Sequence, residues 1–344
     1  MNGSDFRTLP DLALRSFGGS VVYANDELFA ARENLIRPGP ADFDPERFGH
    51  KGKIYDGWET RRRREPGHDV AIVRLGASGI VRGVIIDTSW FKGNYPPEAS
   101  IEATCVDGYP TPDELLESAV WETILPQSPL KGDAQNAFVV ENERCWTHVR
   151  LSIYPDGGVA RLRVHGEAVP DPKFLDPVAL DLAALENGAV VVGCSNLFYS
   201  SPNNLLAPDR PHSMADGWET ARRRDDGNDW VAVQMAAAGL IRMVELDTTY
   251  FVGNAPGRAR LSGCDATSSD IKDPETWFEL LPRARLQPDT RHRFVLAEPR
   301  AATHVRLDIF PDGGMARLRL FGTLTSAGRE AMQRRWREST PHWG

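Results

Sequence analysis

The sequence predicts an all-β protein made of two tandem jelly-roll β-sandwich modules, with a short linker helix and a C-terminal helix. Its 344 residues exceed one typical sandwich and suit two domains. Long motifs occur twice in the same order, which indicates an internal duplication. Within each copy, short runs of alternating apolar and polar residues are separated by glycine- and proline-rich turns, a pattern typical of sandwiches.

The duplication shows in motifs that recur at a nearly constant offset. The run Asp56–Thr60 recurs 160 positions later as Asp216–Thr220. Further along, Thr147–Leu151 recurs 156 positions later as Thr303–Leu307, so the second copy has a small net deletion. Each copy has the length of an ordinary domain.

These copies set the expected domain boundaries. We expect an N-terminal extension over residues 1–15, repeat 1 over 16–168, a linker over 169–186, repeat 2 over 187–325 and a helical tail over 326–344. Prolines punctuate the linker, and its run 178–185 predicts a short helix. In the tail, Ser326 is a suitable N-cap for a helix that continues to Thr340.

The alternation in Thr147–Tyr154 predicts a strand with one apolar and one polar face, and Ala160–His165 alternates in the same way. The turn between them predicts an antiparallel hairpin in which Arg150 lies opposite Arg163. Facing like charges are unfavourable, so an anion is expected between the two side chains.

Two sources of that anion remain open. One is a carboxylate of the chain itself, such as Glu59 or Asp87. The other is a substrate carboxylate, because guanidinium groups bind carboxylates in a planar, bidentate manner. Most basic residues of the chain are arginine, which fits this recognition and also fits a biased genome composition.

Composition and charge exclude several classes of protein. The formal net charge of −8 argues against a general binder of nucleic acid or anionic membranes. No apolar run reaches the roughly 20 residues of a membrane span, and Met1–Pro10 lacks the apolar core of a signal peptide. The four cysteines form no CxxC pair and are expected to be reduced. We therefore expect a cytoplasmic protein.

The two copies differ at several ionisable positions. His68, Lys92 and Tyr95 of repeat 1 correspond to Asn228, Val252 and Ala255 of repeat 2. Either these are surface positions that have simply diverged, or repeat 1 carries the acid–base chemistry. His148, on the polar face of its strand, is either a structural histidine or a general base.

Several runs resemble the signature of the allantoicase family. They are Asp56–Arg64 with His68-Asp69, Asp87–Pro96, and the second-copy motifs Asp216–Thr220 and Thr303–Arg306. The resemblance covers about residues 10–325, and Val70, where repeat 2 has Trp230, is a departure. It implies hydrolysis of allantoate to ureidoglycolate and urea in allantoin and purine degradation. It also implies modules similar to galactose-binding domains and a homo-oligomer.

Candidate site residues follow from the repeated acid and arginine clusters and from what this activity requires. The catalytic candidates are Glu59, His68, Asp87 and Lys92, and the substrate-binding candidates are Arg62, Asn94, Tyr95, His148, Arg150 and Arg163. No zinc motif is present, and we expect no cofactor. A divalent cation such as Mn²⁺ or Ca²⁺ held by Asp56, Glu59 or Asp87 remains open.

Other functions are consistent with the same sequence. A double jelly roll can be a non-catalytic module that binds a ligand or carbohydrate, because a fold does not fix a function. A hydrolase acting on ureidoglycolate and a structural protein with a decayed site are further alternatives. We expect allantoate as the partner, and neither nucleic acid nor membrane.

Overall fold

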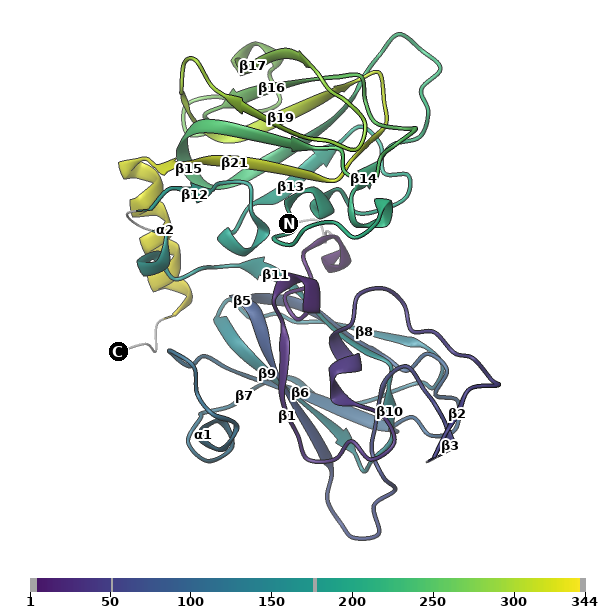
Figure 1. The fold of residues 1–344 in the computed structure, drawn as a ribbon. Coiled ribbons are helices and arrows are strands. Elements are labelled where there is room, and N and C mark those ends of the chain that lie inside the picture. The colour runs from purple at the N-terminus through teal and green to yellow at the C-terminus, as the bar shows by residue number, and fades with distance from the viewer. Residues whose placement is uncertain (1–4, 51, 176–177, 341–344) are drawn as a thin grey trace. The chain divides into compact units, whose positions relative to one another are not determined.

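The computed structural model describes residues 5–50, 52–175 and 178–340, and its regular secondary structure is mostly strand (Figure 1). By internal contacts it divides into two units. The first comprises the residues up to Glu167 together with Ser339 and Thr340, and the second spans Ala168–Glu338. Each unit is a β-sandwich with its own core, so the predicted all-β double sandwich is confirmed. Among the described residues, no helix has the length and apolar character needed to cross a bilayer.

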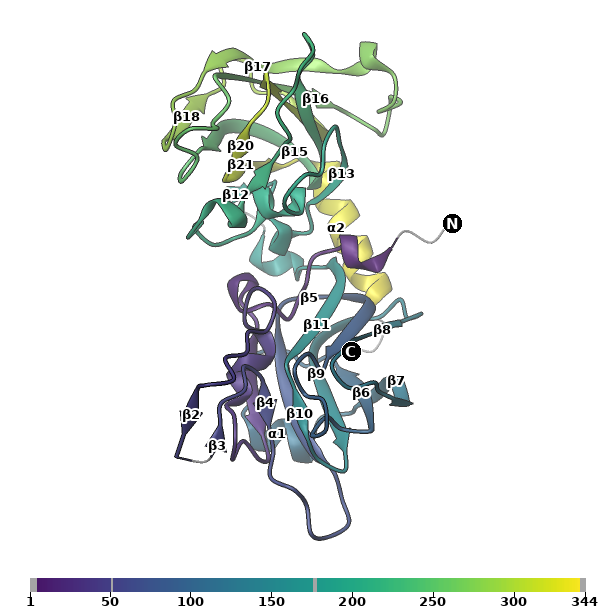
Figure 2. The ribbon, with the colours of Figure 1, turned by 90° about the vertical axis from the view of Figure 1, so that its right-hand side faces the viewer.

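Unit 1 is organised around the 19-residue strand β5 (Asp69–Asp87). The other elements are β1 (Ser20–Ala24), β2 (Phe48–Gly49), β3 (Gly52–Lys53), β4 (Trp58–Glu59), β6 (Glu98–Thr104), α1 (Pro112–Glu117), β7 (Glu122–Pro129), β8 (Gln135–Val139), β9 (Cys145–Tyr154), β10 (Gly158–Val159) and β11 (Arg161–Ala168). One layer has the strand order β1-β5-β9-β6-β7, and β8 and β11 also pair with β5 (Figure 2).

The two halves of β5 belong to different layers. Residues 69–74 pair with β9, whereas residues 83–87 pair with β8, and the register is irregular between Arg74 and Gly79. Side chains from both halves, such as Val73 and Val84, are fully buried. Each such side chain contributes roughly 1.5–3 kcal/mol through burial, so β5 ties the layers into one core.

Unit 2 repeats this plan. Its elements are β12 (Leu180–Asp181), β13 (Val190–Cys194), β14 (Trp218–Glu219), β15 (Asp229–Asp247), β16 (Arg258–Cys264), β17 (Phe278–Arg285), β18 (Arg291–Val295), β19 (Ala301–Phe310), β20 (Gly314–Met315), β21 (Arg317–Leu324) and α2 (Ser326–Ser339). The path β12-β21-β15-β19-β16-β17 forms its sheet, and β13 and β18 pair with the long strand β15.

The predicted hairpin between 147–154 and 160–165 is wrong. Both runs are strands, but β9 lies between β5 and β6, and β11 pairs with β5. Arg150 consequently lies opposite Ile72 and Glu102, not opposite Arg163. The turn at 155–158 leads from β9 to β10, which pairs with β4, and on to β11, which pairs with β5. Alternation predicts which face of a strand is buried but not which strand lies beside it.

The segments predicted to be an N-terminal extension (1–15) and a linker (169–186) each form the first part of a unit. Asp11-Leu12-Ala13 and Asp181-Leu182-Ala183 are copies of one motif, 170 positions apart. The Asp11 carboxylate accepts hydrogen bonds from the backbone N–H of Ala13 (3.1 Å) and Val164 (2.9 Å). The Asp181 carboxylate does the same with Ala183 (3.0 Å) and Leu320 (2.8 Å). Leu12 and Leu182 are fully buried.

The two predicted helices have opposite outcomes. The helix expected over 178–185 is wrong, because Leu180–Asp181 forms β12, followed by a 3-10 turn at Leu185–Asn187. The C-terminal helix is confirmed as α2. Its first turn is capped by Thr325 rather than Ser326, since the Thr325 hydroxyl accepts from the backbone N–H of Gly328 at 3.0 Å.

Candidate active site

A cavity of about 520 Å³ opens in unit 1 where the strand pair β4–β10 meets two loops. Its lining combines acidic, basic, amide and aromatic groups: Phe29, Glu59, Thr60, Arg62, Arg63, Gly93, Asn94, Tyr95, Pro97, Pro155, Asp156 and Gly157. Concave sites with a few converging polar groups among apolar walls are the usual places for small-molecule binding.

The short strand β4 positions the acidic group. Trp58 is fully buried and donates its indole N–H to the carbonyl oxygen of Asp26 at 2.7 Å. Because successive strand residues point to opposite sides, the neighbouring Glu59 is turned toward the cavity. Glu59 lies opposite Gly158 of β10.

Within the described ranges, Glu59 has one side-chain hydrogen-bond partner. The Asn94 amide donates to Glu59 Oε1 at 2.7 Å. The backbone carbonyl oxygen of Asn94 accepts from the backbone N–H of Gly158 at 2.7 Å, which fixes the loop against β10. Burial raises the pKa of the Glu59 carboxyl, and the hydrogen bond from Asn94 opposes this shift. A carboxyl with a raised pKa retains its proton closer to neutral pH and suits acid–base work.

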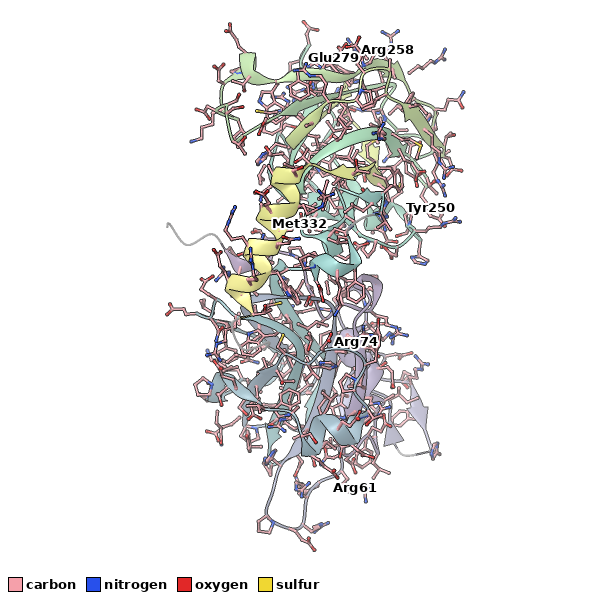
Figure 3. The ribbon with its side chains drawn as sticks, turned by 90° about the vertical axis from the view of Figure 1, so that its left-hand side faces the viewer. Arg61, Arg74, Tyr250, Arg258, Glu279 and Met332 are labelled. Carbon is pink, nitrogen blue, oxygen red and sulfur yellow. The ribbon has the colours of Figure 1, made fainter. Side chains whose placement is uncertain are left out.

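The arginines after β4 have distinct partners. Arg61, labelled in Figure 3, pairs with Asp26 (2.5 Å). Arg63 pairs with the buried Asp69 (2.6 Å). Arg62 is exposed at the cavity and has no ion-pair or hydrogen-bond partner among the residues that the structure describes. It is therefore the guanidinium free to hold an anionic ligand.

The predicted residues do not all converge on this cavity. Glu59, Arg62, Asn94 and Tyr95 line it. Lys92 is next to the lining residue Gly93, but its side chain is 73% exposed and lies 3.7 Å from Asp133.

His68 and Asp87 lie outside the lining. The His68 ring is exposed and packs against Tyr154, with ring centres 4.8 Å apart. Asp87 is buried, and its carboxylate accepts from the backbone N–H of Ser89 at 2.8 Å. This contact organises the turn after β5, which is a structural role.

Arg150 and Arg163 both interact with acceptor groups of the protein rather than facing each other. Arg150 pairs with Glu102 at 2.6 Å, and its guanidinium stacks over Trp121. Arg163 donates to the carbonyl of Gly39 at 2.7 Å and lies 3.5 Å from Asp11. Because the predicted hairpin does not form, the prediction of an anion between the two arginines is wrong, and their ion-pair partners are Glu102 and Asp11.

His148 is a buried histidine outside the cavity lining. Its Nδ1 lies 2.9 Å from the Thr147 hydroxyl. Burial, followed by the positive charge of Arg74, lowers the pKa of His148 to about 4. The imidazole is therefore neutral at ordinary pH.

Sequence reasoning missed Thr60 and Asp156, which hold the cavity rim together. The Thr60 hydroxyl accepts from the backbone N–H of Gly157 at 3.1 Å, and Asp156 accepts from the backbone N–H of Arg63 at 2.8 Å. A signal was present, because the turn Pro155–Gly158 recurs as Pro311–Gly314. We interpreted it only as a hairpin turn.

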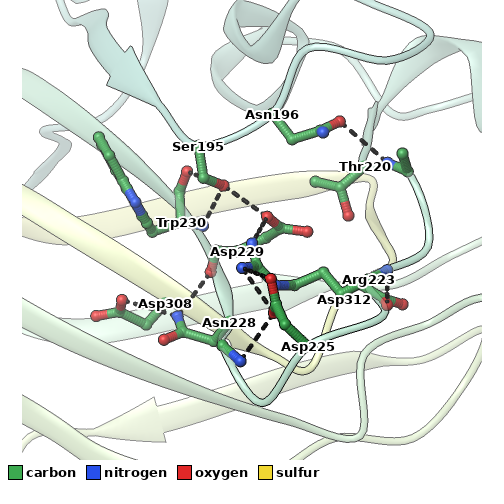
Figure 4. Close-up of polar contacts among 12 residues, drawn as sticks. Ser195, Asn196, Thr220, Arg223, Asp225, Asn228, Asp229, Trp230, Asp308 and Asp312 are labelled. Carbon is green, nitrogen blue, oxygen red and sulfur yellow. Dashed lines mark hydrogen bonds and ion pairs between the residues drawn. The ribbon is translucent and has the colours of Figure 1, made fainter.

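Unit 2 has the same framework with one added carboxylate (Figure 4). Asn254 donates to Glu219 at 2.5 Å, and Arg223 pairs with Asp229 at 2.9 Å, as their equivalents do in unit 1. However, Asp225 also accepts from Arg223 Nε (2.8 Å) and Nη2 (2.9 Å). The equivalent residue of unit 1, Glu65, makes no such contact among the described residues.

The carboxylates considered as metal ligands, Asp56, Glu59 and Asp87, do not form a metal site. The described residues contain no cluster of three or more His, Cys, Asp and Glu that could hold an ion.

Comparison with known proteins gives a consistent family. The allantoicase-repeat family model matches residues 10–169 and 180–325. A protein of Nocardia farcinica described as a probable allantoicase is 56% identical, over 93% of this chain and 95% of that protein. A probable allantoicase of Streptomyces avermitilis is 52% identical, over 97% and 90%.

Solved structures agree with this result. The crystal structure of allantoicase from Saccharomyces cerevisiae is 34% identical with a TM-score of 0.76, over 92% of this chain and 96% of that one. A second structure of allantoicase is 35% identical with a TM-score of 0.77, over 92% and 93%. The resemblance seen in the duplicated motifs is thus confirmed along nearly the whole chain, and the chain belongs to the allantoicase family.

Proposed function

We propose that this chain is a hydrolase that converts allantoate and water into ureidoglycolate and urea at the cavity of unit 1. Membership of the allantoicase family supports the reaction. The observation that supports the location is the pair of complementary groups at one cavity. They are the guanidinium of Arg62, which has no partner among the described residues, and a carboxyl with a raised pKa, Glu59.

Arg62 matches the charge of the substrate. Allantoate carries one carboxylate and two ureido groups on a central carbon. The planar guanidinium fork binds a carboxylate through two parallel hydrogen bonds. This places the central carbon and its ureido groups inside the cavity, where Phe29 and Tyr95 provide flat apolar walls.

Glu59 supplies the proton that the reaction needs. The bond between the central carbon and one ureido nitrogen breaks, and the nitrogen takes a proton from the Glu59 carboxyl and leaves as urea. The oxygen of water bonds to the central carbon to give the hydroxyl of ureidoglycolate, and the proton released from that water restores Glu59. Asn94 keeps the carboxyl in place throughout.

We also propose that turnover does not depend on a divalent cation. Each carboxylate considered as a ligand already has a different partner. Asp56 pairs with Arg161 at 2.5 Å, Asp87 accepts from the backbone of Ser89, and Glu59 accepts from Asn94. Urea release should therefore continue in EDTA, and loss of activity that Mn²⁺ restores would contradict this part of the proposal.

The decisive experiment measures urea release from allantoate by the purified protein and two matched variants. Glu59→Gln removes the acid and should lower kcat about 10²–10⁴-fold with little change in KM. Glu219→Gln changes the same Glu–Asn pair in unit 2 and should leave kcat near the wild-type value. Equal activity of wild type and Glu59→Gln would contradict the assignment of Glu59.

Two further outcomes separate the alternative functions. Binding of allantoate without any urea release would favour a non-catalytic binding protein. Turnover of ureidoglycolate in preference to allantoate would favour a hydrolase for that compound.

Finally, we propose that the protein is a cytoplasmic homo-oligomer. Cell fractionation and light scattering of the purified protein test this, and a secreted protein or a monomer would contradict it.

A further inference from the structure

We propose that Gly132 is a positioning residue. Its missing side chain lets the ring of Tyr95 form one wall of the substrate cavity, and unit 2 is not catalytic because it lacks this wall. The inference rests on the proposed function, since it concerns the same cavity. Neither the sequence repeats nor the family comparison singles out Gly132.

The contact between Gly132 and Tyr95 leaves no room for a side chain. A Cβ atom at position 132 would lie 2.4 Å from Cδ1 and 2.5 Å from Cε1 of Tyr95. It would also lie 3.0 Å from the carbonyl oxygen of Phe91, so it could not move away from the ring into the backbone behind it. Non-bonded carbon atoms are normally about 3.5–4.0 Å apart. Any larger residue at this position therefore displaces the Tyr95 ring.

Unit 2 contains the same turn with equivalent hydrogen bonds, so the residues of the two turns can be aligned one by one. The Thr88 hydroxyl donates to the carbonyl of Lys131, and the Thr248 hydroxyl donates to the carbonyl of Gln287, both at 2.6 Å. These contacts align Gly132, which follows Lys131, with the residue that follows Gln287.

The next residue of each turn confirms that alignment. The backbone N–H of Trp90 donates to Asp133, and that of Tyr250 donates to Asp289, both at 2.8 Å. Gly132 and Pro288 precede these two aspartates and therefore occupy equivalent positions.

The two units differ at both members of the pair. Unit 1 has Tyr95 with Gly132, and unit 2 has Ala255 with Pro288. In unit 2, which has no tyrosine at this position, the turn accommodates the side chain of Pro288. In unit 1, which has the Tyr95 ring, the equivalent residue of the turn is a glycine. Such a coupled exchange is expected if Gly132 exists to make room for Tyr95, and it leaves unit 2 without the wall.

The wall has a defined use for a flat substrate. Tyr95 and Phe29 are the aromatic residues of the cavity lining, and a planar ureido group packs well against an aromatic face. Holding the substrate at the right distance from Glu59 matters because an error of about 1 Å can reduce the rate a hundredfold.

The test is Gly132→Ala in the full-length chain, measured by steady-state urea release. Gly132 does not have a positive φ, so the backbone accepts alanine there. We expect KM to rise about tenfold or kcat/KM to fall by that factor, because the displaced ring holds the substrate poorly. Pro288→Ala changes the equivalent turn of unit 2 and should leave both constants unchanged.

A double-mutant cycle shows whether Gly132 acts through Tyr95. In a Tyr95→Ala background, adding Gly132→Ala should have no further effect, because the ring that it displaces is gone. Additive losses, or a wild-type kcat/KM for Gly132→Ala, would overturn the inference. If wild type releases no urea, the proposed function fails instead, and allantoate binding to the same four proteins still tests the wall.

Discussion

At the residue scale, the chemistry depends on which charged side chains already have partners. Arg61, Arg63, Arg150 and Arg163 are each paired with a carboxylate of the chain, whereas Arg62 has no such partner in the part of the chain that the structure describes. A paired guanidinium has little remaining capacity to hold a substrate carboxylate, and moving it would leave its carboxylate partner unpaired. The count of arginines in the sequence therefore says little, and their partners decide which one binds.

Asn94 should set the pH range in which Glu59 acts. Its hydrogen bond favours the ionised carboxylate and so lowers the pKa of Glu59, against the raising effect of burial. Removing it in Asn94→Ala should raise that pKa further. Because the proposed acid is the protonated form, the fall of kcat/KM at high pH should move to higher pH. Asn254→Ala, the same change in unit 2, serves as control, and an unmoved profile in Asn94→Ala would contradict the role of Glu59 as the acid.

His148 should make folding stability depend on pH. The folded-state pKa is about 4, below the ordinary histidine value near 6.5. Between these values the unfolded chain binds a proton that the folded chain does not, so stability falls as pH falls through this window. The loss reaches about 3 kcal/mol at pH ~4 and levels off below that pH.

The measurement is urea denaturation at several pH values. His148→Asn, which cannot titrate, should lose less stability than wild type between pH ~7 and pH ~4.5. His50→Asn changes an exposed histidine and should follow wild type. Parallel curves for wild type and His148→Asn would show that the buried imidazole is not neutral in the folded chain.

At the element scale, local pattern predicts strands well and predicts their partners poorly. The alternation in 147–154 correctly places a strand there, and the helix near 326–339 follows from an unbroken run without glycine or proline after its first turn. The neighbours of β9 are β5 and β6, which come from sequence positions far before it. In a sandwich, sheet neighbours are set by how the core packs, and no local signal encodes this.

The same limit explains the partial prediction of the site. Glu59 and Arg62 were found because they belong to one duplicated run that ends at a strand, and Asn94 and Tyr95 because they belong to another. His68 was a candidate because repeat 2 differs there and because His68-Asp69 belongs to a run that resembles the family signature. Such a difference shows that a position has changed, but it does not show where the side chain lies. Gly132 gave no signal, because its importance lies in the space that it leaves for Tyr95.

At the scale of the whole molecule, duplication produced two similar frameworks with different capacities. Both units keep the Glu–Asn pair and an arginine bonded to a buried aspartate. In unit 2, Asp225 also accepts from two further N–H groups of Arg223, and Ala255 stands where unit 1 has Tyr95. One framework can thus serve as a binding site while the other is retained for the stability of its fold.

This asymmetry predicts one allantoate site per chain. Glu59→Gln should bind allantoate without consuming it, because Arg62 and Tyr95 remain, so calorimetric titration of this variant should give a stoichiometry of one. Adding Arg62→Gln should weaken binding about 10–100-fold, the usual loss for a charge-assisted contact. Adding Arg222→Gln, the equivalent change in unit 2, should leave affinity and stoichiometry unchanged. A stoichiometry of two, reduced to one by Arg222→Gln, would instead show that unit 2 still binds the substrate and that Ala255 and Asp225 have not closed its site.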